Sequence, residues 1–127
     1  MLIAIEGIDG VGKTTQSRLL EGYLKDKGYN VICMSEPTNG KWGRKIREMI
    51  KVGRDNTSPE EELYLFTEDR KEDVYMNILP ALEEKKIVIM DRYYISSIAY
   101  QGALGIDRKR IKEMNEEFAP VPHLTII

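Results

Sequence analysis

Four short runs of consecutive apolar residues are spaced along the chain and separated by longer segments with helical spacing. The runs are continuous rather than alternating, which is typical of strands that are covered on both faces. Such strands belong to a parallel sheet with helices on both sides, so the pattern predicts an α/β fold. The predicted strands are residues 2–5, 31–34, 87–90 and 124–127.

The segments between these runs predict the helices. Residues 14–27 place their apolar side chains on one face, and Gly28 then suits the end of a helix. Ser58 and Pro59, followed by two glutamates, predict the start of a helix that passes Pro80 and ends near residue 85. Further helices are expected at residues 41–51, at 92–104 or 96–104, and at 107–118.

The last apolar run coincides with the end of the chain. In open α/β sheets, ligands bind at the carboxyl ends of the strands, so a natural domain rarely stops there. No repeat, low-complexity tract or linker divides the sequence. We therefore expect a single domain over residues 1–127, truncated after its fourth strand.

Composition narrows the class of protein. The chain has 127 residues, is 42% hydrophobic and 31% charged, and has a net charge of −2. This charge gives no basic surface for nucleic acid or membrane, so we expect neither partner. The single cysteine, Cys33, excludes an internal disulfide and fits a reducing, cytoplasmic location as a buried structural thiol. The single histidine, His123, is assigned no role.

The segment at positions 7–14 reads GIDGVGKT and matches the phosphate-binding pattern G-x-x-x-x-G-K-[ST] after a predicted strand. Its glycines let the backbone curl with its N–H groups pointing inward, which forms a nest for anions. Lys13 can reach the β/γ-phosphates of a nucleotide, and Thr14 can place its hydroxyl on Mg²⁺. A plain glycine turn would explain the glycines but not Lys13 and Thr14. The glycines are Gly7, Gly10 and Gly12.

A second candidate group follows the predicted strand at 87–90. Asp91 at the strand end can hold the Mg²⁺ shell, and Arg92 can bind a second phosphate with its two-pronged guanidinium. In the alternative interpretation, Asp91 only caps the next helix and Arg92 is a surface residue.

Two pairs of residues are spaced to recognise a base. Phe66 and Arg70 lie four apart on one helix face, where a ring can stack on a base and a guanidinium can donate to its carbonyl. Ser97 and Gln101 are also four apart and could contact a base edge. By itself, the first pair is more often a core aromatic and a solvated arginine that pairs with Glu or Asp. The second pair is equally compatible with the exposed polar positions of an ordinary amphipathic helix.

Asp9 lies inside the phosphate-binding segment. A carboxylate that faces the γ-phosphate would repel it, unless the carboxylate accepts a hydrogen bond from a hydroxyl of a second substrate. Asp9 therefore indicates a kinase with two substrates rather than a hydrolase.

Together these segments resemble the thymidylate kinase family. The resemblance extends from the first residues to about Gly102, in order and spacing. The matching motifs are Glu6-Gly7-x-Asp9-Gly10-x-Gly12-Lys13-Thr14-Thr15, Ser35-Glu36-Pro37, Phe66-x-x-x-Arg70, and Asp91-Arg92-Tyr93-x-x-Ser96-Ser97-x-Ala99-Tyr100-Gln101-Gly102.

The resemblance implies a nucleoside monophosphate kinase-like, P-loop NTPase-type fold and transfer of the γ-phosphoryl group of ATP to dTMP, giving dTDP for dTTP synthesis. The implied cofactors are ATP and Mg²⁺, and the implied assembly is a homodimer. The implied residues on the ATP side are Gly7, Gly10, Val11, Gly12, Lys13, Thr14 and Thr15, with Thr14 and Asp91 for the metal. The implied residues on the dTMP side are Asp9, Glu36, Pro37, Phe66, Arg70, Arg92, Ser97, Tyr100 and Gln101. The implied catalytic residues are Asp9, Lys13 and Arg92.

By the same resemblance, Asp9 takes the sugar 3′-hydroxyl and Arg92 binds the dTMP phosphate. Phe66 stacks on thymine, Arg70 donates to its O4, and Tyr100 lies where a ribose 2′-hydroxyl would clash. Ser97 and Gln101 contact the base edge, while Glu36 and Pro37 shape the pocket.

Two residues depart from the family pattern. Ser35 stands where many members have arginine, and Gly10 assigns the chain to the class whose basic catalytic residues come from a later lid. We expect the lid, the last strand and the helices after it to be missing, so that the 127 residues alone bind nucleotide with weak turnover or none. The alternatives are a nucleotide-binding module without turnover, or a kinase for another nucleotide or a deoxynucleoside.

Overall fold

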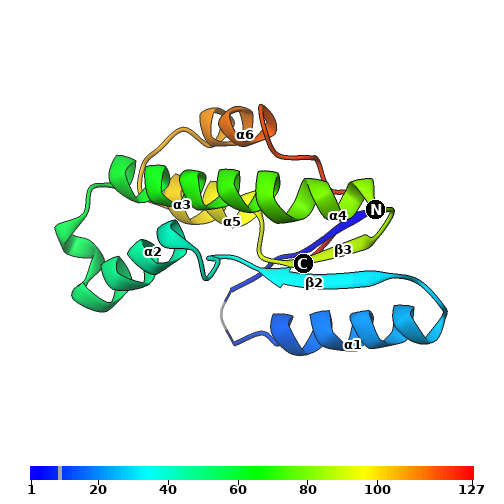
Figure 1. Cartoon of the computed structure of the whole chain (residues 1–127). Coiled ribbons are helices and arrows are strands. Elements are labelled where there is room, and N and C mark those ends of the chain that lie inside the picture. Colours follow the sequence, from blue (N-terminus) through cyan, green and yellow to red (C-terminus); the bar gives the residue numbers. More distant parts are fainter. Residues whose placement is uncertain (9) are drawn as a thin grey trace.

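The computed structural model describes residues 1–8 and 10–127. Its strands form one parallel sheet in the order β2-β3-β1-β4 (Figure 1). The strands are β1 (Leu2–Ile5), β2 (Val31–Ser35), β3 (Ile87–Asp91) and β4 (Leu124–Ile126). The helices are α1 (Lys13–Asp26), α2 (Lys41–Val52), α3 (Pro59–Asp73), α4 (Leu79–Glu83), α5 (Tyr94–Ala103) and α6 (Arg108–Glu116). The predicted α/β class is confirmed.

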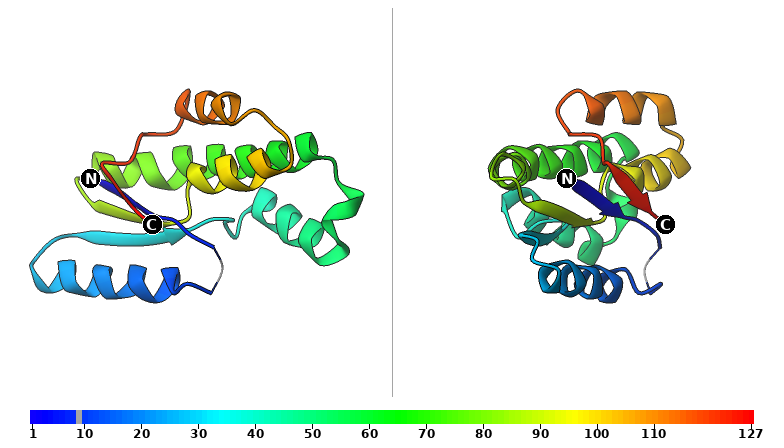
Figure 2. Two further views of the ribbon diagram at one scale, coloured as in Figure 1. Left: turned by 180° about the vertical axis from the view of Figure 1, so that it is seen from behind. Right: turned by 90° about the vertical axis from the view of Figure 1, so that its right-hand side faces the viewer.

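The helices form two unequal layers. Helix α1 lies on one face of the sheet, and α4 with the helical turn before it lies over the other. Helices α3 and α5 extend past the carboxyl ends of the strands, and α6 is outermost (Figures 1 and 2). The connections from β1 to β2 and from β2 to β3 run in opposite directions along the sheet. Since such crossovers are right-handed, their helices must lie on opposite faces.

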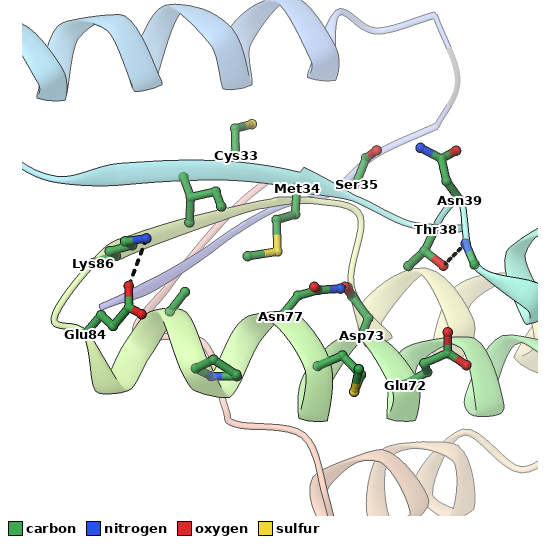
Figure 3. A pocket seen from close by; sticks show the side chains of 15 residues that line it. Cys33, Met34, Ser35, Thr38, Asn39, Glu72, Asp73, Asn77, Glu84 and Lys86 are labelled. Atoms are coloured by element: carbon green, nitrogen blue, oxygen red, sulfur yellow. Dashed lines mark hydrogen bonds and ion pairs between the residues drawn. The ribbon is translucent and has the colours of Figure 1, made fainter.

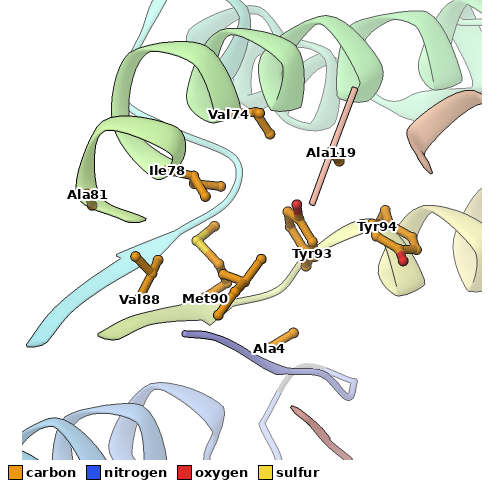
Figure 4. Close-up of a cluster of buried hydrophobic side chains, with 10 residues drawn as sticks. Ala4, Val74, Ile78, Ala81, Val88, Met90, Tyr93, Tyr94 and Ala119 are labelled. Atoms are coloured by element: carbon orange, nitrogen blue, oxygen red, sulfur yellow. The ribbon is translucent and has the colours of Figure 1, made fainter. Parts of the chain in front are cut away.

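The two inner strands contribute side chains to both layers. Leu2, Ala4, Val88 and Met90 are fully buried and pack toward the helices after β2 (Figure 4). Alternate residues of the same strands, such as Ile89, point instead to α1. This explains why β1 and β3 are continuously apolar.

The outer strands depart from that pattern. The prediction that all four runs are covered on both faces is wrong for β4, where Leu124 is 51% and Ile126 is 40% exposed. Among the described residues, β4 pairs with β1 alone and lies at one edge of the sheet. β2 forms the other edge and is also partly exposed.

Local sequence signals set the helix ends. The Ser58 hydroxyl accepts a hydrogen bond from the backbone N–H of Glu61 at 3.1 Å, which confirms the predicted start of α3. Gly28 follows α1 with a left-handed φ of 89°, as expected for a residue that ends a helix. The helical path continues from α3 through one π-helical turn (η2, Val74–Ile78) into α4, so it passes Pro80 as predicted. A 3₁₀ turn at Arg54–Asn56 (η1) has no counterpart in the prediction.

His123 has a structural role that the sequence did not reveal. Its ring Nδ1 accepts a hydrogen bond from the Leu2 backbone N–H at 3.0 Å, and the His123 backbone N–H donates to the Leu2 carbonyl at 2.8 Å. These bonds attach the segment before β4 to the start of β1.

Across residues 1–8 and 10–127, no helix has the length and apolar character needed to cross a membrane.

Candidate functional site

Three loops leave the sheet at the same edge. In the strand register, Ile5 of β1 and Ser35 of β2 both pair with Asp91 of β3. The segments that follow these residues are therefore brought together at the carboxyl ends of the strands. Loops at this edge form the ligand site in open α/β sheets.

The phosphate-binding segment curls between β1 and α1. Gly7, Gly10 and Gly12 have φ values of 148°, 82° and 90°, which residues other than glycine rarely adopt. Gly12 precedes α1, whose N-terminus has no side-chain cap, so its backbone N–H groups face the loop. Such an arrangement suits an anion. Asp9 lies outside the described residues.

Lys13 and Thr14 contact the rest of the site from the first turn of α1. The Lys13 Nζ donates to the Ile8 carbonyl at 2.7 Å, which holds the ammonium group over the loop. The Thr14 hydroxyl donates to Asp91 Oδ2 at 2.8 Å. A hydroxyl and a carboxylate in contact are the oxygen ligands that Mg²⁺ prefers, so this pair fits the metal expected there.

Two cavities meet at the carboxyl edge of the sheet. Both are lined by Pro37 and Arg92, and no other residue is shared between them. The first cavity, of about 430 Å³, is also lined by Gly10, Gly12, Lys13, Thr14, Thr15, Ser35, Glu36, Arg47 and Asp91. The second, of about 350 Å³, is also lined by Ile50, Arg54, Phe66, Ser96, Ser97, Tyr100 and Gln101. A phosphate cleft thus adjoins a pocket that contains aromatic and amide side chains.

Arg92 stands at the junction in a strained backbone conformation. Its φ is 74°, which is uncommon for any residue but glycine and is typical of functional sites. The backbone is held there by a bond from its N–H to the Ile5 carbonyl at 2.9 Å. The guanidinium lies over the Tyr100 ring, 5.6 Å from the centroid. The position of Arg92 at the end of β3 therefore places its guanidinium between the two cavities.

Gln101 offers an acceptor in the second cavity. Its Nε2 donates to Glu62 Oε1 at 3.2 Å, and because a carboxylate only accepts, this bond sets which way the amide points. Gln101 Oε1 is buried and has no hydrogen-bond partner among the described residues. A ligand with an N–H donor would satisfy it.

Arg70 lies elsewhere than the sequence suggested. It is 1% exposed and does not line the second cavity. Its guanidinium donates to Glu36 Oε1 at 2.8 Å, Ser97 Oγ at 3.0 Å, Asn115 Oδ1 at 2.9 Å and the Tyr93 carbonyl at 3.2 Å. The expected contact with a base disagrees with this placement, because Arg70 does not line the cavity. The alternative of a solvated arginine disagrees with it as well, because the side chain is buried. In this position Arg70 supports Ser97 and Glu36.

Glu36 and Asp73 form a buried carboxyl pair next to Arg70. Burial raises the pKa of Glu36 to about 8, with the adjacent Asp73 carboxyl adding to the shift and Arg70 opposing it. Burial also raises the pKa of Asp73. Glu36 Oε2 and Asp73 Oδ2 are buried and have no hydrogen-bond partner among the described residues. Because the pKa of each carboxyl is raised, we expect the folded chain to retain a proton on this pair near neutral pH.

Comparison with known proteins identifies the family. The family model described as thymidylate kinase matches residues 5–127. The chain belongs to the thymidylate kinase family.

Individual thymidylate kinases agree with this assignment. The chain is 54% identical to the "Probable thymidylate kinase" of Archaeoglobus fulgidus over all 127 residues, which cover 63% of that relative. It is 50% identical to the thymidylate kinase of Akkermansia muciniphila, with 98% of this chain and 60% of the relative covered. The crystal structure of thymidylate kinase from Ehrlichia chaffeensis matches 98% of this chain and 70% of its own, with a TM-score of 0.87 and 40% identity. The chain thus spans less than two thirds of the length of these two curated relatives.

The thymidylate kinase fold brings most of the predicted site residues to the two cavities, and it adds others. Arg47 and Arg54 also line the cavities, and the sequence patterns did not indicate either of them. Glu62 orients Gln101, and a helical spacing of four from Phe66 could have indicated it. Asn115 supports Arg70 from α6, and no local pattern indicates that role.

Proposed function

We propose that this chain forms the nucleotide-binding part of a thymidylate kinase, which transfers the γ-phosphoryl group of ATP to dTMP. Family membership and the junction of a phosphate cleft with a base-sized pocket support the proposal. The products would be dTDP and ADP.

The ATP phosphates would bind the loop of Gly7 to Thr15. Backbone N–H groups and Lys13 would neutralise the donor phosphates, and Thr14 with Asp91 would hold Mg²⁺. When bound, Mg²⁺ supplies charge neutralisation on the β- and γ-phosphates. The protein itself needs little covalent chemistry, because catalysis of this reaction rests on placing two anions in line.

The dTMP molecule would span the two cavities. Arg92, at their junction, would bind its phosphate, while Phe66 would stack on its base. The observation that favours thymine is the buried, unpartnered Oε1 of Gln101. The N3–H of thymine can donate to this acceptor, whereas cytosine has an acceptor at the same ring position. Leaving a buried acceptor unpaired costs about 1–3 kcal/mol, so this atom alone can discriminate between the bases.

Calorimetric titration of the chain with dTMP, dCMP, dGMP and thymidine tests this proposal. We expect dTMP to bind more tightly than the other three. Replacement of Gln101 by Leu should remove the preference for dTMP over dCMP, whereas Gln16→Leu, on exposed α1 surface, should not. Equal affinity for dTMP and dCMP in the unsubstituted chain would contradict the thymine assignment, and preference for thymidine would contradict the role of Arg92. Release of ADP in the presence of ATP and dTMP separates transfer from binding alone.

The proposed enzyme is a homodimer in the cytoplasm. Exposed apolar side chains on two neighbouring helices support a helix-packed dimer face, and they are Ile50, Val52 and Tyr64. The free thiol of Cys33 supports a reducing compartment. Light scattering of the purified protein would measure the assembly.

A further inference from the structure

Helix α3 holds the segment after β2 through a paired hydrogen bond. Asp69 is 2% exposed, and its two carboxylate oxygens accept from a single residue, Thr38. The Thr38 backbone N–H donates to Oδ2 at 2.9 Å and its hydroxyl donates to Oδ1 at 2.6 Å. The same hydroxyl accepts from the Gly40 N–H at 3.1 Å, as the dashed line in Figure 3 shows. Thr38 is therefore fixed from both its backbone and its side chain.

Helix α2 contacts the same segment from a second direction. Arg47 donates to the carbonyls of Pro37 and Thr38. Gly43 packs so closely that a Cβ there would lie 1.8 Å from the Thr38 carbonyl oxygen. The segment at 37–38 is thus held between two helices, and the carboxylate of Asp69 supplies the contact from α3.

This segment carries the wall that both cavities share. Pro37 has no N–H to donate, so its own backbone bond is the one that its carbonyl accepts from Arg47, and Thr38 supplies the next backbone contacts. Phe66, on the same helix as Asp69 and three residues earlier, lines the second cavity with Pro37. Helix α3 therefore supplies one wall directly and holds the other through Asp69.

We infer that Asp69 is a positioning residue for the acceptor site, which fixes the spacing between Pro37 and Phe66 by holding Thr38. This inference rests on the proposed binding of dTMP across the two cavities. A carboxylate suits the role because it presents two acceptors in the geometry that matches two donors of one residue. Alanine at position 69 would leave both donors without this partner.

Hydrogen exchange tests the positioning directly, without any ligand. In Asp69→Ala, we expect the Thr38 amide to exchange at least about tenfold faster, since loss of about 1.4 kcal/mol of protection corresponds to that factor. Amides in the middle of α3 and α5 should keep their rates. The matched control is Glu68→Ala, which removes a partly exposed carboxylate one residue away. Unchanged exchange at Thr38 in Asp69→Ala would overturn the inference.

Calorimetric titration then tests the consequence for binding. Asp69→Ala should weaken dTMP by about tenfold and Thr38→Val, which keeps the backbone donor, by about threefold. ATP should weaken less than dTMP, because Pro37 borders both cavities whereas Phe66 borders only the second. Thr38→Ser should restore the affinity, because it retains the hydroxyl. If dTMP and ATP weaken by the same factor, or exchange rises in all helices, Asp69 is merely structural and the inference fails. If the unsubstituted chain does not bind dTMP, the proposed function fails, and the exchange at Thr38 still decides whether Asp69 holds this segment.

Discussion

Replacement of Asp73 by Asn should remove much of the pH dependence of stability between about pH 5 and pH 8. Burial raises the pKa values of both Glu36 and Asp73, so we expect the folded protein to retain one proton on this buried pair near neutral pH. In Asp73→Asn, the amide can donate to Glu36 Oε2 while its oxygen still accepts from Asn77, whose Nδ2 donates to Asp73 at 2.9 Å (Figure 3). The substitution supplies the same hydrogen bond without a titrating proton.

The size of the effect follows from the number of protons bound. The Glu36 pKa is about 8 in the folded chain, compared with an ordinary value of 4.5. Between these values the folded state holds a proton that the unfolded state has released, so the free energy of unfolding falls as pH rises, by at most about 1.4 kcal/mol per pH unit. From pH 6 to pH 8 the loss is about 2–3 kcal/mol, and it levels off at higher pH. Glu6, whose pKa burial also raises, should leave a smaller slope in the variant.

Urea unfolding, followed by fluorescence of the single tryptophan, measures this slope at half-unit steps of pH. Trp42 of α2 contacts the Tyr64 ring of α3 edge to face, with centroids 5.7 Å apart, so unfolding changes its surroundings. The control is Glu83→Gln, at an exposed position of α4, which should keep the slope of the unsubstituted chain. A slope in Asp73→Asn equal to that of the unsubstituted chain would show that Asp73 does not contribute to retention of the extra proton.

Substitutions at three other positions separate stability from binding. Asn115→Ala should lower the free energy of unfolding by about 2–3 kcal/mol, because it leaves a buried guanidinium donor of Arg70 unpaired; a urea midpoint within error of the unsubstituted chain would contradict this. Ser58→Ala should cost about 1 kcal/mol in the same measurement through loss of the α3 cap, and Ser58→Gly less. Lys13→Ala should weaken ATP at least about tenfold by calorimetry with the unfolding free energy nearly unchanged; a collapse in stability would make Lys13 structural.

The elements that the sequence predicted well are those set by local or repeated signals. The runs of β1 and β3 are continuously apolar because both faces are buried, and Ser58 starts α3 through a bond to a residue only three positions away. The spacing of the glycines predicted the position of the phosphate-binding loop, since few other residues adopt the backbone conformations at Gly10 and Gly12. The exposure of β4 depends on which elements pack beside the strand, and its own three residues do not encode this.

Helix α3 shows why the rest of the site was harder to predict. Its buried face includes Glu62, Asp69, Arg70 and Asp73, so the helix lacks the apolar stripe that marks a buried face in sequence. The partners that make this burial tolerable come from other elements, with Glu36 following β2, Asn115 in α6 and Gln101 in α5. A pattern within the helix can therefore indicate Phe66 and Arg70 as a spaced pair, yet it cannot distinguish an arginine that reaches a base from one that holds the residues lining the pocket. Only the long-range contacts make that distinction, and here they favour support over contact.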